Sequence, residues 1–389
     1  MPKITMFHTE WNGCAYWRVF QPAKFLNKLS GNEFEVVYFE KEKQLKGSIE
    51  YYYEKCKGSD LIVSMRCDNI KSVQMLMVLR HMCKVPLVFE TDDDFQNVDK
   101  LNIASKHWER GGEPFTAATM QMEESDALQF STMPLKRSFG YKLGKPTFVM
   151  PNLIDLDLAS HRVLNDSDTI RIVWAGSASH YQDLKMVMPA IERILSEYKN
   201  VRFASIGMRC DYMYEGEGKD RKLRDGFEYI EGCSFKHWNQ LLGSSKADIA
   251  IVPLEDMKFN VCKSNCRYLE WSVLKVPGIY SEVYPYAKTI THLQDGFKIP
   301  MFAHNRVASK GTIESWYKYL KMLIESKDLR TEIGERAFET VKDNYSLQNN
   351  ISIWADNYSK IYGIPFDLRD IDEAEEAIGD SLCQVQSQE

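Results

Sequence analysis

The stretch ADIAIVPLEDMKFNVCKSNCRYLEWSVLKVPGIYSE, residues 247–282, has the order strand, loop, helix, strand. The run IAIV is a short buried strand, and apolar residues then recur at helical spacing over 264–275. Ser264 is a suitable N-cap residue, Pro277 ends the helix, and VPGIYSE reads as the next strand. Continuous apolar strands joined by helices are typical of a parallel sheet covered on both faces.

The same alternation runs through most of the 389 residues. Before residue 151 the expected strands are KITMFHT, FEVVYFE, DLIVSMR, PLVFETD, ALQFST and PTFVMP. After residue 168 they are IRIVWAGS, VRFASIG, FEYIEG, ADIAIVPL and VPGIYSE. Helices are expected at 18–29, 70–83, 133–142, 183–198, 235–243, 264–275 and over much of 312–362. The fold class is therefore α/β with two Rossmann-like parallel sheets, and such sheets bind ligands at the carboxyl ends of their strands.

The domain boundaries follow from a long polar connector, PNLIDLDLASHRVLNDSDT. We expect an N-terminal domain, a linker, a C-terminal domain, a last helix that crosses back to the first domain and an acidic tail. These parts correspond to residues 1–150, 151–168, 169–345, 346–365 and 366–389.

Composition excludes several classes of protein. A hydrophobic content of 44% allows large cores, and a net charge of −6 does not favour sequence-independent binding to DNA or to an anionic membrane. The opening MPKITMFHTE has no signal-peptide pattern, and no apolar run is long enough to span a bilayer. Nine cysteines at irregular spacing indicate reduced thiols, so we expect a cytoplasmic protein.

The helix expected over 264–275 has cationic side chains at its N-terminus, where the helix dipole is already positive. Lys263, Ser264, Asn265 and Arg267 together offer the amides and cations that a diphosphate needs. Glu270 could accept hydrogen bonds from both vicinal hydroxyls of a ribose. Lys263, Arg267 and Glu270 have i, i+4, i+7 spacing, which predicts that they share one face. The alternative is a surface ion pair between Arg267 and Glu270.

A second ligand-like feature follows the strand that ends at Trp174. The sequence AGSASHYQDL has small residues at Gly176 and Ser177, which would let a phosphate approach the backbone, and His180 could add a donor. A tight strand-to-helix turn needs small residues as well, so this motif alone does not decide. Together, the two features favour a nucleotide-sugar site.

Residues 247–282, with IVWAGSASHYQDL upstream and PNLID in the connector, resemble GT-B glycosyltransferases of the GT4-like type (glycosyl transferases group 1). The resemblance covers most of residues 3–362 and is more specific in the C-terminal half. It implies two Rossmann-like domains that face a central cleft, with the donor in the second. It also implies that Glu270 binds the ribose, that Lys263 lies near the diphosphate, and that Gly176 and Ser177 pack against the phosphates.

One motif departs from the family pattern. The first glutamate of the E-x7-E motif would fall at position 262, where this chain has Cys262, and Glu255 is the nearest upstream acid. A subset of the family has an F-N-x-x-K-S stretch like the one here, which adds Asn260 to the donor-binding residues. A metal pair of Cys262 and Cys266 is the weaker alternative to two core residues, because no second pair or histidine follows at zinc-like spacing.

The N-terminal half is expected to bind the acceptor. The stretch EWNGCAYWRVFQP follows the first strand. The resemblance to GT-B enzymes implies that its Gly13 loop packs against the donor phosphates, with Arg18 as an extra cation. An ordinary first-turn residue is the equal alternative for Arg18. Three aromatic side chains of the same stretch could stack on a sugar or a base: Trp11, Tyr16 and Trp17.

FETDDDF ends a strand with three carboxylates, Asp92, Asp93 and Asp94. Adjacent carboxylates repel one another, so a functional use is expected. They could orient an acceptor hydroxyl, hold a divalent ion or cap the next segment. We favour acceptor binding, with Asp92 or Asp93 in the catalytic role, because the resemblance to GT-B enzymes implies that no metal or other cofactor is required.

The resulting hypothesis is a hexosyl- or pentosyltransferase that uses a UDP- or GDP-sugar. The resemblance to GT-B enzymes implies that it is metal-independent and that it retains the configuration of the sugar. The expected acceptor is a saccharide or glycoconjugate. A hydroxymethylated pyrimidine base in DNA is the alternative acceptor, and a non-catalytic nucleotide-sugar-binding protein is the alternative of another class. The sequence does not indicate an oligomeric state.

Overall fold

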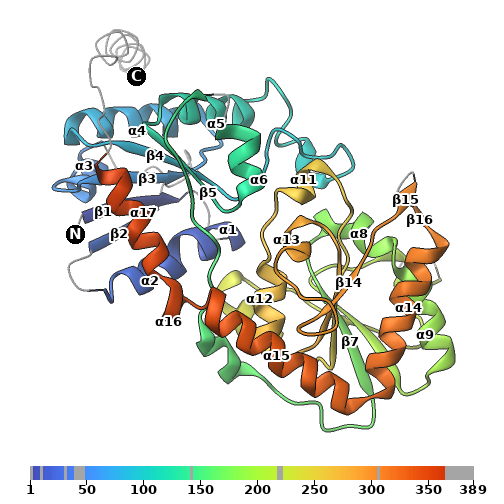
Figure 1. Cartoon of the computed structure of the whole chain (residues 1–389). Coiled ribbons are helices and arrows are strands. Elements are labelled where there is room, and N and C mark those ends of the chain that lie inside the picture. The colour runs from blue at the N-terminus through green and yellow to red at the C-terminus, as the bar shows by residue number, and fades with distance from the viewer. Residues whose placement is uncertain are drawn as a thin grey trace. The chain divides into compact units, whose positions relative to one another are not determined.

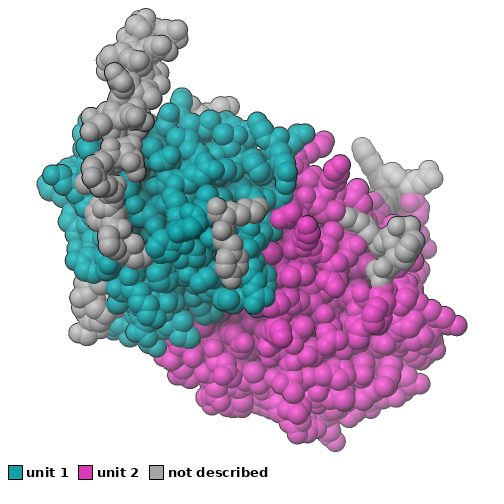
Figure 2. All heavy atoms as spheres, turned by 45° about the horizontal axis from the view of Figure 1, so that its top comes forward, with its two compact units in different colours: residues 1–96, 107–151, 351–389 teal, residues 97–106, 152–350 magenta. Residues whose placement is uncertain are grey.

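The protein is described here by a computed structural model, which covers residues 3–8, 12–29, 33–38, 49–140, 143–216, 222–304 and 307–363. The chain forms two compact units (Figure 2). Unit 1 takes its described residues from 1–96, 107–151 and 351–363, and unit 2 from 97–106 and 152–350. Residues 97–106, which the sequence places inside the first domain, thus group with unit 2, as does the connector from residue 152.

Unit 1 contains a six-stranded parallel sheet in the order β2-β1-β3-β4-β5-β6 (Figure 1). Its strands are β1 Lys3–His8, β2 Glu33–Tyr38, β3 Leu61–Met65, β4 Leu87–Thr91, β5 Ala127–Phe130 and β6 Thr147–Val149. All six predicted strands are confirmed. Every residue of β3, β4 and β5 is buried, as expected for central strands covered on both faces.

The helices of unit 1 include two short π-helical stretches, η1 and η4. Within its described residues, the helices of this unit are α1 Gly13–Ala15, η1 Tyr16–Phe20, α2 Gln21–Leu26, α3 Ile49–Cys56, α4 Ile70–Cys83, α5 Glu113–Glu124, α6 Met133–Leu135, η4 Lys136–Gly140 and α17 Ser352–Tyr362. The predicted helix 70–83 is confirmed as α4. Its N-cap Asn69 accepts a hydrogen bond from the Ser72 amide, and Lys84 ends it in the left-handed conformation.

Unit 2 also has a six-stranded parallel sheet, in the order β11-β8-β7-β12-β13-β14. Its strands are β7 Ile170–Ala175, β8 Val201–Ile206, β11 Phe227–Ile230, β12 Ile249–Val252, β13 Gly278–Ser281 and β14 Phe297–Ile299. Two hairpins are separate from it: β9 Tyr214–Glu215 with β10 Lys222–Leu223, and β15 Ala303–His304 with β16 Val307–Ala308. In chain order the sheet reads 3-2-1-4-5-6, which is the Rossmann order.

The helices of unit 2 fall before, between and after these strands. They are η3 Ile103–Ser105, η5 Leu156–His161, η6 Ala178–His180, α8 Tyr181–Lys185, α9 Met188–Glu197, η7 Asp211–Met213, η9 Phe235–His237, α10 Trp238–Ser244, α11 Lys258–Val261, α12 Cys266–Val273, α13 Tyr284–Ala287, α14 Lys310–Glu325, α15 Lys327–Tyr345 and α16 Leu347–Asn350. The predicted helix 183–198 is two helices, α8 and α9. Strand β14 has no counterpart among the predicted strands.

Each unit has a core of its own. The core of unit 2 joins the sheet to α9 and α14 through residues such as Ile191, Phe203 and Trp316. A core cluster in unit 1 joins Phe7 and Ile62 of the sheet to Leu76 of α4. Among the described helices, none has both the length and the apolar character needed to cross a membrane.

Candidate functional site

In unit 2 the strand order reverses between β7 and β12, which pair directly. Loops that leave the carboxyl ends of two such strands run in opposite directions and open a crevice, where doubly wound sheets bind their ligands. The loop after β7 contains Gly176, Ser177 and His180, and the loop after β12 leads to Asn260 in α11. The fold therefore brings two of the predicted donor-binding motifs to one edge of the sheet.

Gly176 has a packing role at this edge. A Cβ atom at this position would lie 2.6 Å from the Trp174 ring, so no larger residue fits without moving the indole. The Gly176 amide donates to the Ile206 carbonyl at 3.1 Å. The expectation that small residues expose this backbone to phosphate is thus not met at Gly176, because its N–H already completes the pairing of β7 with β8.

Asp183, which the sequence analysis did not select, connects the two loops. Its Oδ2 lies 2.8 Å from His180 Nδ1, and its Oδ1 accepts from the Glu255 amide at 2.7 Å. The Asn260 side chain reaches the same Oδ1 at 3.4 Å and donates to the Glu255 carbonyl at 3.0 Å. Asp183 is only 5% exposed, so this buried carboxylate fixes the geometry of both loops.

A cavity of about 280 Å³ lies beside Asp183. Its walls come from the loops after β7, β8 and β12 and from segment 97–106, and its lining includes Asn102, Tyr181, Arg209 and Glu255. Pockets for drug-sized ligands span about 300–1,000 Å³, so this cavity suits part of a nucleotide sugar rather than all of it.

The helix that was expected over 264–275 begins later. α12 starts at Cys266 with Asn265 as its N-cap, and Asn265 makes no capping hydrogen bond. The prediction that Ser264 caps the helix is wrong, because Ser264 Oγ instead accepts from Asn152 Nδ2 at 2.7 Å. Lys263 lies in the turn before the helix, with its ammonium 4.5 Å above the Phe259 ring. The helical spacing that was predicted to align it with Arg267 and Glu270 therefore does not apply.

Arg267 and Glu270 form an ion pair of 2.5 Å on the first turns of α12. Although the Arg267 side chain is 28% exposed, the carboxylate is not solvated, because Glu270 is 1% exposed. Its second oxygen, Oε1, accepts from the Trp238 indole N–H at 2.9 Å. Trp238 is the residue that sequence reasoning missed here, and a tryptophan at a helix start gives no signal of its partner.

Arg18 of unit 1 has a different environment from the one expected. It is 0% exposed, its Nε and Nη2 pair with the two oxygens of Glu90 at 2.7 and 3.1 Å, and its Nη1 donates to the Met150 carbonyl at 2.6 Å. Its guanidinium also lies 4.8 Å from the Trp354 ring centre. An arginine with these contacts holds unit 1 together, so we do not propose it as a cation for the donor.

The carboxylates that follow β4 have a cation of their own, Arg66, which directly follows β3. Arg66 lies 3.3 Å from Asp92 and 3.6 Å from Asp93, and it donates to Thr91 Oγ1 at 2.7 Å. Asp94 is separate from the other two: it is 1% exposed and accepts from Ser138 Oγ at 3.0 Å. Arg66 thus offsets the repulsion between Asp92 and Asp93, and Asp94 has a hydrogen-bond donor of its own in Ser138.

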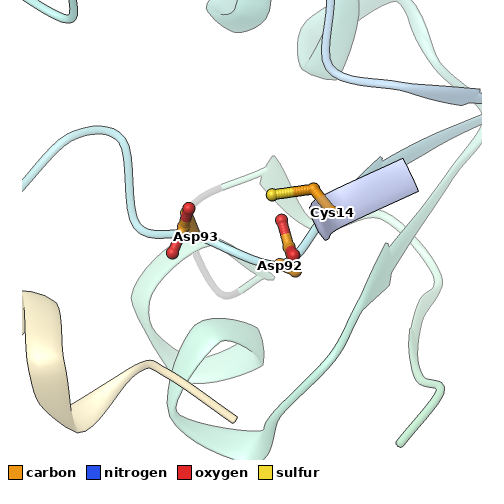
Figure 3. Close-up of side chains that lie close together, drawn as sticks. All are labelled: Cys14, Asp92 and Asp93. Carbon is orange, nitrogen blue, oxygen red and sulfur yellow. The ribbon is translucent and has the colours of Figure 1, made fainter. Parts of the chain in front are cut away.

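Cys14 lies beside Asp92 and Asp93, with all three ligand atoms within 4.8 Å of one another (Figure 3). Such a group could in principle hold a metal ion. Burial, and then the charges of Asp92 and Asp93, raise the pKa of the Cys14 thiol well above its usual value. A bound metal would need the thiolate and would compete with Arg66 for both carboxylates. The expectation that this cluster binds the acceptor rather than a divalent ion stays a prediction.

The remaining residues predicted for unit 1 are the donor-binding Gly13 and the aromatic acceptor residues near it. Trp17 is 5% exposed and packs edge-on against Tyr16, so it does not offer a face for stacking. The half-buried Tyr16 accepts a hydrogen bond from Gln21. Gly13 opens α1, where Asn12 caps the turn by accepting from the Ala15 amide. Trp11 and the predicted tail 366–389 lie outside the described residues.

No known family model matches the sequence, and no curated protein matches it either. Several solved structures match it over nearly their whole length. Anabaena HepE in complex with UDP and glucose has a TM-score of 0.63 at 11% identity, covering 94% of this chain and 100% of that chain. The protein has the GT-B fold.

Two more GT-B structures show the same correspondence. Sucrose-phosphate synthase from Thermosynechococcus elongatus has a TM-score of 0.58 at 11% identity, with coverage of 93% and 99%. A glycosyltransferase from Rickettsia africae has a TM-score of 0.60 at 14% identity, with coverage of 93% and 97%. The predicted GT-B architecture, with two Rossmann-like units, is confirmed.

Proposed function

We propose that this GT-B protein is a GT4-like glycosyltransferase that moves a sugar from a nucleotide diphosphate sugar to an acceptor hydroxyl, with retention and without a metal. Unit 2 is the donor side and unit 1 the acceptor side. The observation that carries the proposal is the buried Glu270 carboxylate, held by Arg267 and Trp238 in the domain with Rossmann strand order. The HepE structure contains UDP and glucose, which supports a UDP-sugar as the first donor to test.

In this proposal Glu270 accepts hydrogen bonds from the ribose hydroxyls. Lys263 and Arg267 attract the diphosphate, and the Ser264 and Asn265 segment brings backbone N–H groups close to it. His180, held by Asp183, adds a donor near Ser177. Negative charge builds on the departing diphosphate as the glycosidic bond breaks, so cations placed there lower the barrier.

On the acceptor side, Asp92 and Asp93 orient the attacking hydroxyl. Arg66 bridges the two carboxylates and keeps them in place. Asp94, bound to Ser138, shapes the same strand end without facing the acceptor. A saccharide or glycoconjugate suits this arrangement, because paired carboxylates are good acceptors for sugar hydroxyls.

The test is an assay of the purified protein with a panel of UDP- and GDP-sugars, with mass spectrometry of the products, in EDTA and again with added Mg²⁺. Release of nucleoside diphosphate in EDTA, with a glycosylated product from a saccharide panel, supports the proposal. Nucleotide binding without turnover of any donor would indicate a binding protein instead. Transfer to hydroxymethylated duplex DNA, and to no saccharide, would overturn the acceptor class.

A further inference from the structure

Trp238 occupies the first position of α10, and its indole reaches across to α12. Its Nε1–H donates to Glu270 Oε1 at 2.9 Å, while Arg267 Nη1 holds Glu270 Oε2 at 2.5 Å. Each oxygen of the buried carboxylate therefore has one donor, and the two donors come from different helices. This arrangement fixes the plane of the carboxylate as well as its position.

The indole ring is itself held on two sides. The Arg267 guanidinium lies 4.8 Å from its centre, and the Phe235 ring stacks on it at 5.9 Å with an interplanar angle of 17°. Trp238 is 7% exposed, so it has little freedom to turn. Trp238, Arg267 and Glu270 thus form a closed set in which each residue contacts the other two.

We propose that Trp238 is a positioning residue that makes this site selective for ribonucleotides over deoxyribonucleotides. A carboxylate can accept about four hydrogen bonds, and the indole and guanidinium use two of them. The remaining lone pairs, one on each oxygen, suit the two vicinal hydroxyls of a ribose. This inference rests on the proposed nucleotide-sugar function. It identifies Trp238 as the residue that makes the site prefer ribose to deoxyribose.

The neutral indole has a specific advantage over a second cation. An N–H donor orients Oε1 without neutralising its charge, so the carboxylate keeps its strength as an acceptor. Without that donor, Oε1 is a buried acceptor that has lost a partner, and the carboxylate can turn toward Arg267. A deoxyribose has one hydroxyl fewer, so the fixed plane of the carboxylate adds less to its affinity. Its affinity should therefore fall less when the carboxylate is free to turn.

The test is Trp238→Phe, which keeps an aromatic ring against Phe235 and Arg267 but removes the N–H. The dissociation constants of UDP and 2′-deoxy-UDP, and of GDP and 2′-deoxy-GDP, would be measured by calorimetry. We expect ribonucleotide affinity to fall about threefold to tenfold, the effect of one hydrogen bond, with deoxyribonucleotide affinity nearly unchanged. In a Glu270→Gln background, Trp238→Phe should remove no further selectivity.

Trp316→Phe is the matched control. Trp316 is 0% exposed in the same unit, and its Nε1 has no hydrogen-bond partner among the described residues. The Trp316→Phe variant should leave the preference for ribonucleotides over deoxyribonucleotides unchanged. Equal losses for ribo- and deoxyribonucleotides in Trp238→Phe, or a wild-type protein that binds both equally, would overturn this inference alone. Failure of the wild-type protein to bind any of the four nucleotides would overturn the proposed function with it.

Discussion

Glu270 and Glu90 are both buried glutamates paired with an arginine, but their surroundings differ. Glu90 in unit 1 is 0% exposed and spends both oxygens on one guanidinium. Glu270 in unit 2 meets a guanidinium on one oxygen and a neutral indole on the other. Both carboxylates accept two hydrogen bonds, but Glu90 receives both from one cation, whereas Glu270 receives one from a cation and one from a neutral donor.

Replacing Glu270 or Lys263 by alanine tests the donor site. We expect each variant to lose glycosyl transfer, because the first removes the proposed ribose acceptor and the second the cation proposed to lie next to the leaving diphosphate. Turnover of the preferred donor and circular dichroism would be measured on the purified proteins. Lys199→Ala, an exposed lysine of unit 2, is the control. Near-normal turnover in both site variants would refute the assignment.

Replacing Glu90 by alanine tests the structural role of Arg18. The substitution leaves a guanidinium buried without its counter-charge, which costs about 3–5 kcal/mol of unfolding free energy. Urea unfolding, followed by a probe in unit 1, would measure the loss. Arg18→Met combined with Glu90→Leu should recover part of it, because no charge is then left buried. A loss below about 1 kcal/mol in Glu90→Ala would contradict this account.

At the scale of elements, the turn after β7 is closely packed at Gly176. Gly176→Ala places a methyl group 2.6 Å from the Trp174 ring, which must then shift in a packed core. We expect unit 2 to lose about 1–3 kcal/mol of stability, measured by thermal or urea unfolding.

Gly311→Ala is the comparison for that variant. Gly311 lies in the first turn of α14, and a Cβ atom there would have only the Ser309 hydroxyl within 4 Å, at 3.9 Å. This variant should be neutral or slightly stabilising, because alanine favours helix. Equal effects of the two substitutions would show that the Trp174 contact does not limit position 176.

The sequence was sufficient to predict most strands but not the start of α12. Apolar runs such as LIVSM and IAIV signal buried strands directly, because in a parallel sheet both faces are covered. Strand β14 is only three residues, FKI, and its alternation is too short to stand out. Ser264 looked like an N-cap, but its hydroxyl is taken by Asn152, which is 112 positions away in sequence.

The contacts of the candidate site were likewise predictable only where the partners are close in sequence. Glu270 and Arg267 are three residues apart, so their contact follows from helical spacing. Trp238, Asp183 and Arg66 depend on contacts between elements that are distant in sequence, and no local pattern marks them. Arg18 was expected to be either an extra cation for the donor phosphates or an ordinary first-turn residue. Its buried pairing with Glu90, 72 positions away in sequence, has no local signal.

For the whole molecule, two sheets with separate cores imply two unfolding steps. A nucleoside diphosphate that binds only unit 2 should raise the unfolding temperature of that unit and leave the other unchanged. At a hundredfold excess over the dissociation constant the gain is about 2.7 kcal/mol. Differential scanning calorimetry with and without UDP or GDP would measure it, and a shift confined to unit 1 would contradict the donor assignment.

The path of the chain through unit 1 has a consequence for synthesis on the ribosome. Helix α17 belongs to this unit, and its Trp354 donates to the Pro151 carbonyl at 2.9 Å and covers Arg18. Unit 2 is encoded almost entirely between the two parts, so roughly 200 residues must be translated after Pro151 before α17 emerges. At about 5–20 residues per second, that takes about 10–40 s. During synthesis, the Arg18–Glu90 pair is therefore not covered by Trp354 until nearly all of unit 2 has been translated.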